Sequence, residues 1–333
     1  MAKSRYPVLD QEGEGDLSTA GSFAGPPHLP AAVFATTGYL APACSAQAKS
    51  GMPAPTRKCR ASALHDINRC KTAPDAACLG KCREMQLNNP GPDMTSRVLL
   101  GMLTPSSNTI LEPVTTAMIS GLPEVSAHFS RFKVTEIALS DSALAQFDDG
   151  EILRAAELLA HAKVDVIAWN GTSSGWLGFE RDVQLCERIT QATGIASCTA
   201  MLALNELLQK TGAKRIGFVT PYRDDVQARI NANYEKAGFE VAADRHLGMQ
   251  DNFSFSEVTD DQMRVMTRDV AAAQPDAIAI VCTNMRGAPL AAELEAAHGI
   301  PLYDTVSTTV WKSLKTAGVD TNRVEGWGKL FGV

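Results

Sequence analysis

The segments VDVIAWNGT (residues 164–172) and QPDAIAIVCT (residues 274–283) are two copies of one pattern. Each copy has an aspartate, Asp165 or Asp276, followed by an apolar run of strand length and then by small polar residues. Two flanking pairs keep the same order along the chain: RVLLGMLTP (97–105) with RIGFVTP (215–221), and GIA (194–196) with GIP (299–301). Such a repeat predicts two homologous α/β lobes that face each other across a cleft, with matching strand ends meeting there.

The two copies differ at one position where chemistry is expected. When Asp165 is aligned with Asp276, Gly171 falls on Cys282. A thiol therefore comes from one lobe only, and the other lobe contributes no side chain at the equivalent place.

Apolar runs alternate with helical patterns from Val98 onward. The runs of strand length are 98–103, 164–169, 216–220 and 277–281, and the segments 151–163 and 201–208 carry their aliphatic residues on one helical stripe. This alternation predicts an α/β fold with a doubly wound parallel sheet in each of two pseudo-symmetric lobes and an active site in the cleft between them. We place the first lobe at 94–212 and the second at 213–333, with terminal elements that the lobes can exchange.

Residues 1–93 have a different character. They contain Pro and Gly clusters without a sustained helical or strand period, and they hold five of the eight cysteines. The absence of paired histidines near Cys78 and Cys82 argues against a zinc site. We interpret this segment as a disordered extension or as an over-extended gene start, with Met94 as the biological start.

Composition narrows the class of partner. The formal net charge is −6 and no basic stripe is present, which argues against nucleic acid. No apolar run approaches the roughly 20 residues of a membrane-spanning helix, and the N-terminus does not resemble a secretory signal. We therefore expect a cytoplasmic protein that contacts no membrane, and a homo-oligomer is compatible with the sequence.

Small polar side chains follow three of the predicted strands. Asn108 lies in a loop after the first strand, Thr172 and Ser173 follow a glycine after the second, and Tyr222 follows the third. Helix capping explains such residues one loop at a time. Together they predict a nest of hydrogen-bond donors for an anion, because the carboxyl ends of the strands converge.

Cys282 follows the fourth predicted strand. A buried cysteine is more often an inert apolar residue than a reactive one, but the repeat and an expected helix N-terminus, where a thiolate is stabilised, favour a catalytic role. Cys186 and Cys198 are assigned to helical segments and to structural roles. The histidines lack partners at catalytic or metal-ligand spacing, so we predict neither a catalytic triad nor a metal site.

These motifs together resemble the aspartate/glutamate racemase superfamily, and within it the branch of maleate cis-trans isomerase and arylmalonate decarboxylase. The resemblance covers 94–333. It implies that Asn108, Tyr222 and Asn252 hold substrate carboxylates, as in the isomerase, and that no cofactor is needed. In the decarboxylase a Gly-Thr-Ser loop, here Gly171, Thr172 and Ser173, forms an oxyanion pocket beside one catalytic cysteine. Thr283 and Asn284 stand where the decarboxylase has two glycines, and we expect them to contact substrate.

The resemblance implies a small dicarboxylic acid as substrate. The decarboxylase, like this chain, has glycine opposite its single cysteine, so we expect decarboxylation of a malonate-type acid through an enediolate that Cys282 protonates. A cysteine placed at position 171 should then add a second proton donor. A maleate-type isomerase is the alternative, opposed by Gly171, and a non-catalytic carboxylate-binding protein is a third interpretation. A two-cysteine racemase is disfavoured because it requires two acids.

Overall fold

The computed structural model describes residues 97–141, 143 and 149–333. The extension predicted for residues 1–93 lies outside the described residues. Within the described part of the chain, no helix is long and apolar enough to cross a membrane.

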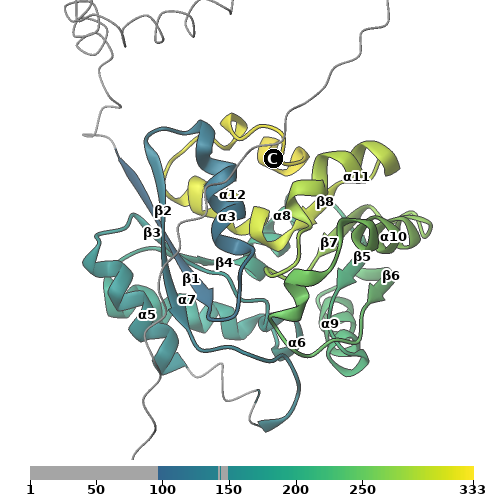
Figure 1. Ribbon diagram of the computed structural model, residues 1–333, viewed down its shortest axis with the longest axis horizontal. Helices are drawn as coiled ribbons and strands as arrows, with labels where there is room; N and C mark the ends of the chain where they lie inside the picture. The colour runs from purple at the N-terminus through teal and green to yellow at the C-terminus, as the bar shows by residue number, and fades with distance from the viewer. Residues whose placement is uncertain (1–96, 142, 144–148) are drawn as a thin grey trace, which may run out of the picture. The chain divides into compact units, whose positions relative to one another are not determined.

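Two four-stranded parallel sheets form the framework, with one sheet in each lobe (Figure 1). The first sheet has the order β2-β1-β3-β4 and the second has the order β6-β5-β7-β8. The strands are β1 (Val98–Pro105), β2 (Val125–Phe132), β3 (Val166–Trp169), β4 (Ser197–Thr199), β5 (Arg215–Thr220), β6 (Glu240–His246), β7 (Ala277–Ile280) and β8 (Leu302–Asp304). The identical strand order confirms the predicted fold class of two pseudo-symmetric, doubly wound α/β lobes.

Helices cover both sheets. They are α3 (Leu111–Met118), α5 (Asp149–His161), α6 (Ser174–Leu177), α7 (Glu180–Thr193), α8 (Ala200–Lys210), α9 (Asp224–Lys236), α10 (Asp260–Ala271), α11 (Ala291–His298) and α12 (Thr305–Thr316). Short 3-10 turns occur at η3 (Ile119–Gly121), η4 (Ser254–Glu257), η5 (Ala288–Leu290), η6 (Thr321–Arg323) and η7 (Lys329–Gly332). Figure 1 shows α5 and α7 together on one side of the first sheet, with α3 and α12 on the other.

The internal repeat extends to backbone conformation. Lys163 and Gln274, each two residues before the repeated aspartate, have positive φ values of 53° and 51°. Such values are uncommon for residues other than glycine. The same unusual turn therefore leads into β3 and into β7.

The repeated aspartates make the same contact in both lobes. The Asp165 carboxylate accepts a hydrogen bond of 2.7 Å from the backbone N–H of Leu99, at the start of β1. Asp276 accepts one of 2.9 Å from Arg215, at the start of β5. Each aspartate thus pins the start of the neighbouring strand, which explains why this residue recurs at this place in the pattern.

The sequence pattern missed the outer strands β2, β4, β6 and β8. The side chains of β2 and β6 are mostly half-buried, and β4 and β8 have three residues each, so neither pair shows the continuous apolar run of a central strand. Cys198 accordingly lies in β4, where a helical position was expected. Cys186 lies in α7, as expected.

The last long helix crosses between the lobes. α12 follows β8 of the second sheet but packs against α3, α8 and β3 of the first lobe. The hydroxyl of Thr308 on α12 donates a hydrogen bond of 3.1 Å to the carbonyl of Ala200, where α8 begins. The boundary at 212/213 stays a prediction, because α12 belongs to one half by sequence and contacts the other by packing.

Candidate active site

A small cavity lies where the carboxyl ends of β1, β3, β5 and β7 meet. Its lining comes from both lobes: Pro105, Val134, Ile137, Trp169, Asn170, Gly171, Thr172, Trp176, Tyr222, Asn252, Cys282 and Thr283. The cavity volume is about 20 Å³, which is room for about one water molecule. No Lys, Arg, His, Asp or Glu side chain lines the cavity, so any anion bound here is held by neutral donors.

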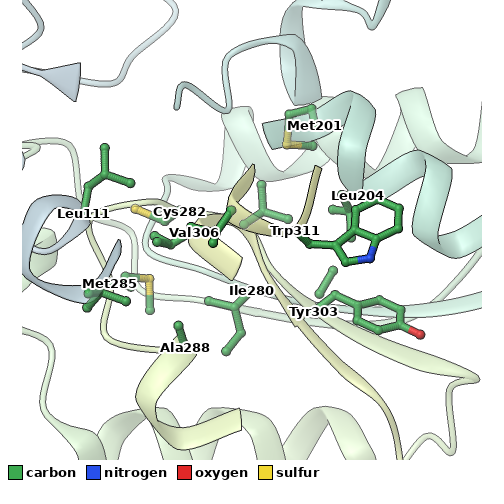
Figure 2. Close-up of a cluster of buried hydrophobic side chains, with 14 of the residues drawn as sticks. Leu111, Met201, Leu204, Ile280, Cys282, Met285, Ala288, Tyr303, Val306 and Trp311 are labelled. Atoms are coloured by element: carbon green, nitrogen blue, oxygen red, sulfur yellow. The ribbon is translucent and has the colours of Figure 1, made fainter. Parts of the chain in front are cut away.

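Cys282 presents its thiol to this cavity. The residue is 3% exposed, and its sulfur accepts a hydrogen bond of 3.4 Å from the backbone N–H of Asn284 and another from the Tyr222 hydroxyl. Figure 2 shows the thiol at the edge of a cluster of apolar side chains that includes Leu111 and Val306. Burial raises the pKa of Cys282 to about 12.

The expectation of a stabilised thiolate at Cys282 was wrong. The 3-10 turn η5 starts six residues after Cys282 and leads into α11, so no helix N-terminus lies directly at the sulfur. Desolvation outweighs the hydrogen bonds to the sulfur from Asn284, Tyr222 and Met285, because burial penalises the charged form of a thiol. Cys282 is therefore a protonated thiol at neutral pH, which suits a proton donor better than a standing nucleophile.

Tyr222 and Thr172 form a hydroxyl pair across the cleft. Their oxygens are 2.7 Å apart, and both residues line the cavity. The Tyr222 ring is fixed by edge contacts with Trp176 and Phe255, at centroid distances of 5.2 and 5.7 Å. Burial raises the pKa of Tyr222 well above its usual value, so the phenol keeps its proton and remains a donor.

Trp169 occupies the space beside Gly171. A Cβ atom at position 171 would lie 2.3 to 2.8 Å from three atoms of the Trp169 indole, so the ring would have to shift to accommodate it. The indole is itself held against Phe132, with ring centroids 4.7 Å apart. Glycine at 171 thus fits against the ring as it lies here, and a larger residue would require the indole to move. The sequence pattern assigned Trp169 only to a strand and missed its place on the cavity wall.

Asn108 is committed to contacts within the protein. Its side-chain carbonyl accepts hydrogen bonds of 2.9 Å from the N–H groups of both Ile110 and Leu111, at the start of α3. Its amide group donates to the carbonyl of Thr283 at 3.0 Å and to the hydroxyl of the same residue at 3.2 Å. Asn108 is outside the cavity lining, and its bonds cap a helix and join the lobes.

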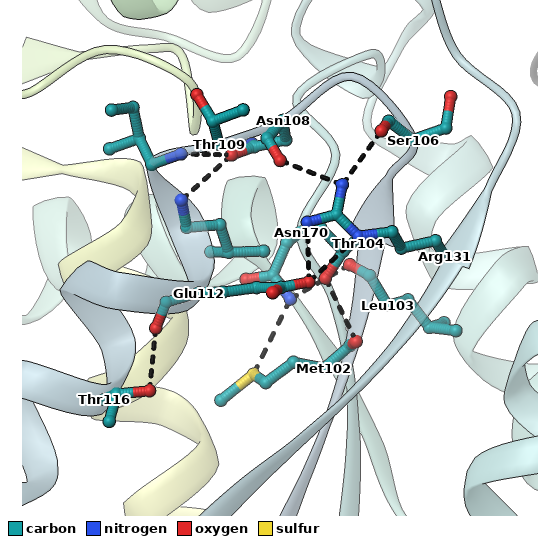
Figure 3. Close-up of polar contacts among 12 residues, drawn as sticks. Met102, Leu103, Thr104, Ser106, Asn108, Thr109, Glu112, Thr116, Arg131 and Asn170 are labelled. Atoms are coloured by element: carbon teal, nitrogen blue, oxygen red, sulfur yellow. Dashed lines mark hydrogen bonds and ion pairs between the residues drawn. The ribbon is translucent and has the colours of Figure 1, made fainter. Parts of the chain in front are cut away.

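The loop that carries Asn108 is braced from β2. Arg131 donates to the carbonyls of Ser106 and Asn108, at 2.8 and 3.0 Å, and pairs with Glu112 on α3 (Figure 3). This guanidinium is therefore engaged with the loop rather than with the cavity.

The remaining predicted amides also connect the lobes. Asn284 accepts a hydrogen bond of 3.0 Å from the N–H of Thr109 and donates one of 2.6 Å to the carbonyl of Asn252. The Asn252 amide donates to the Ser107 hydroxyl at 3.0 Å. Thr283 donates to the carbonyl of Asn170 at 3.0 Å. Asn252 and Thr283 reach the cavity wall, whereas Asn284 lies behind it.

Ser173 faces another region. It lines a second cavity together with Asp182, and Trp169 contributes to the walls of both cavities. The structure therefore brings six predicted residues together, namely Gly171, Thr172, Tyr222, Asn252, Cys282 and Thr283, and leaves Asn108, Ser173 and Asn284 outside the lining.

Metal ligation has no evident place in this part of the molecule. Within residues 97–141, 143 and 149–333, no group of three or more His, Cys, Asp or Glu side chains is arranged to hold a metal ion. The side chains in the cavity wall that carry donor groups are hydroxyls, amides, two indoles and a thiol.

Two facing α/β lobes with one protonated thiol and a hydroxyl pair in the interlobe cavity define a class of protein. Residues 108–331 match the family model described as arylmalonate decarboxylase. The chain belongs to this family. Its relatives include maleate isomerases as well as an arylmalonate decarboxylase.

Relatives and solved structures of both kinds are similar to this chain. Maleate isomerase from Pseudomonas putida is 27% identical over 252 residues, which cover 72% of this chain and 98% of that protein. Arylmalonate decarboxylase from Bordetella bronchiseptica is 26% identical over 169 residues, which cover 50% of this chain and 70% of that protein. The crystal structure of the maleate isomerase Iso from Pseudomonas putida S16 has a TM-score of 0.66 at 25% identity, covering 70% of this chain and 98% of its own.

Proposed function

We propose that this protein is a cofactor-independent enzyme that decarboxylates a small dicarboxylic acid of the malonate type, with Cys282 as the proton donor. The observation that carries the proposal is the asymmetry of the cavity. A protonated thiol lies on the second-lobe side, and the equivalent position of the first lobe is Gly171, covered by Trp169. One acid on one face suits a reaction that delivers one proton to carbon.

The cavity of about 20 Å³ must open to admit a dicarboxylate, and the proposed reaction then has two steps. In the first step, the bond between the α-carbon and one carboxylate breaks, CO2 leaves, and the electron pair moves into the remaining carboxylate as an enediolate. The hydroxyls of Thr172 and Tyr222 are positioned to donate hydrogen bonds to that developing charge. In the second step, the proton of the Cys282 thiol moves to the α-carbon, and water later restores the thiol.

The surroundings of Cys282 suit both halves of its cycle. Its raised pKa keeps the proton on sulfur until a strongly basic carbanion forms. The thiolate left behind is then held by the Asn284 N–H and the Tyr222 hydroxyl. These donors are already in place, so little reorganisation accompanies the charge transfer.

The apolar part of the cavity favours loss of a charged group. The side chains of Pro105, Val134 and Ile137 offer no hydrogen bond to a carboxylate, whereas neutral CO2 needs none. A carboxylate placed against them loses solvation that the site does not replace, and its departure relieves that cost.

Maleate-type cis-trans isomerisation is the second candidate. It is supported by the length over which maleate isomerase from Pseudomonas putida matches, 98% of that protein. It is opposed by Gly171, because addition to a double bond from the first lobe would need a nucleophile at that position.

Proton NMR in deuterated water tests the proposal. Malonate, methylmalonate, phenylmalonate and maleate are each incubated with the protein. We expect a malonate-type acid to lose CO2 and to gain deuterium at the α-carbon. Formation of fumarate from maleate, without turnover of any malonate, would support the isomerase instead.

Cys282→Ser tests the role of the thiol. We expect at least about a 100-fold loss of turnover, because a hydroxyl is a much weaker acid than a thiol. Cys198→Ser is the matched control: Cys198 is also buried with a pKa of about 12, but it lies 3.6 Å from the Ser313 hydroxyl and away from the cavity. If Cys282→Ser were as active as Cys198→Ser and the wild type, Cys282 would have no role in the mechanism.

A further inference from the structure

Trp169 carries a buried donor that no protein atom satisfies. The residue is 1% exposed, and its indole nitrogen Nε1 has no hydrogen-bond partner among the described residues. A buried N–H left unpaired is costly, so a structure that keeps one requires a reason.

Trp169 lines the cavity of the candidate active site, and its Nε1 lies on the part of the ring next to Gly171. The atoms Nε1, Cε2 and Cζ2 are those nearest to the Cβ position of residue 171, with Nε1 at 2.8 Å. Gly171 lines that cavity and is absent from the wall of the second one. The unpartnered nitrogen therefore lies beside a residue that lines the substrate space.

We propose that the Trp169 indole N–H donates a hydrogen bond to a carboxylate oxygen of the substrate, on the first-lobe wall at the position equivalent to Cys282. This assignment rests on the proposed function in taking a dicarboxylate as the ligand. The cavity offers no cationic side chain, so neutral donors must hold the anion. Trp169 would supply an indole donor from the first lobe, beside the hydroxyls of Thr172 and Tyr222.

The same indole closes the first-lobe face to a second acid. Its ring fills the volume in which a side chain at 171 would begin, and Phe132 supports it from behind. Trp169 therefore binds the acid from the face opposite Cys282 and leaves the thiol as the proton source. Trp169 is a substrate-binding and specificity-determining residue in this assignment.

Indole N–H signals in proton–nitrogen NMR provide a direct test on the unaltered protein. The chain has four tryptophans, so four signals are expected, and Trp176→Phe, Trp311→Phe and Trp327→Phe assign three and leave that of Trp169. Sodium malonate is titrated into wild-type protein, and into Cys282→Ser where malonate is consumed. We expect the Trp169 signal to move downfield on binding, while that of Trp311 stays in place.

Trp169→Phe measures the effect of the donor on affinity. It removes the N–H and keeps an aromatic ring against Phe132, so we expect malonate to bind about 10- to 100-fold more weakly by calorimetry. Trp311→Phe is the matched control, because Trp311 is also buried with an unpartnered Nε1 but packs on α12 outside the cavity lining. The control should bind malonate as wild type does.

The outcomes separate the inference from the proposed function. Malonate binding with an unmoved Trp169 signal, or with unchanged affinity in Trp169→Phe, overturns the inference and leaves the proposed decarboxylation intact. A wild-type protein that binds none of malonate, methylmalonate and maleate overturns both. If Trp169→Phe does not fold, the NMR titration of the wild-type protein decides alone.

Discussion

At the scale of single residues, location matters more than acidity. Cys198 and Cys282 are both buried, and burial raises the pKa of each thiol to about 12. Only Cys282 shares a cavity wall with Tyr222 and Thr172. A thiol that is hard to ionise can still act as an acid toward a carbanion, provided that the carbanion forms next to it.

Gly171 provides a test of the close contact with Trp169. Gly171→Ala should lower the free energy of unfolding by about 1–3 kcal/mol, because the new methyl group must displace a packed indole. Urea denaturation measures the change. Replacing the indole by a smaller side chain, in the double variant Trp169→Leu with Gly171→Ala, should reduce the stability lost through Gly171→Ala. A double-mutant cycle detects this coupling.

The same contact revises the effect expected of a cysteine at 171. Gly171→Cys alone places its side chain into the Trp169 ring, so it should destabilise the protein without supplying a usable second acid. A Gly171→Ala variant as stable as wild type would show that the indole moves aside readily. The prediction that a cysteine at position 171 adds a second proton donor would then stand.

At the scale of secondary-structure elements, α12 begins at a buried carboxyl group. Asp304 caps the helix, accepting a hydrogen bond of 2.8 Å from the N–H of Val306, and it is fully buried. Burial raises the pKa of Asp304 from 3.8 to about 7, despite further backbone N–H groups of Ser307 and Ala288. Besides burial, the charge of this carboxyl group raises the pKa of the Cys282 thiol through electrostatic repulsion of the thiolate.

This carboxyl group predicts a pH-dependent stability. The folded state holds the Asp304 proton more tightly than the unfolded chain does, so stability should fall as pH rises from about 4 to about 7, where the unfolded chain has released the proton and the folded one has not. The loss should be about 2–4 kcal/mol. Asp304→Asn keeps the capping oxygen and removes the ionisation, so its unfolding free energy should vary less with pH.

Asp320→Asn is the control for Asp304→Asn. Asp320 caps the 3-10 turn η6, but it is exposed and its pKa is lowered by bonds to Asn322, so its titration has the opposite sign. Denaturation curves between pH 4 and pH 8 distinguish the two. An Asp304→Asn variant with the same pH profile as wild type would show that this carboxyl group ionises normally.

At the scale of the whole molecule, the lobes are joined through the residues that surround the cavity. Hydrogen bonds link Asn108 to Thr283, Thr109 to Asn284, and Asn252 to Ser107. The polar residues at the strand ends thus serve two purposes: some line the cavity, and others hold the two walls in register.

Asn108→Ala separates these purposes. The substitution removes buried hydrogen bonds that cap α3 and that join Asn108 to Thr283 of the other lobe. We therefore expect the free energy of unfolding to fall by about 2–4 kcal/mol. Tyr222→Phe should instead cost on the order of 2–4 kcal/mol in transition-state stabilisation and lower the free energy of unfolding by only about 1 kcal/mol, for the lost bond to Thr172. Reduced substrate affinity in Asn108→Ala without loss of stability would return Asn108 to the role of a carboxylate ligand.

The sequence by itself determined the repeat and therefore the architecture. Asp165 and Asp276 are followed by fully buried central strands, and a run of apolar residues between turn signals is a local property that a chain shows without its partners. The same alignment placed Gly171 and Cys282 at equivalent points. Six of the expected residues lie in one cavity because the carboxyl ends of parallel strands converge, which the predicted architecture already implied.

Only the tertiary structure decided which polar residue faces the cavity and which faces the other lobe. Asn108 and Asn252 look alike in sequence, yet one caps α3 and the other reaches the cavity wall. The sequence pattern predicts Trp169 only as a strand residue, whereas the structure places its ring against Gly171. The orientation of a side chain, the burial that sets the pKa of a thiol and the crossing of α12 depend on contacts between segments far apart in the chain, and a local pattern carries no record of them.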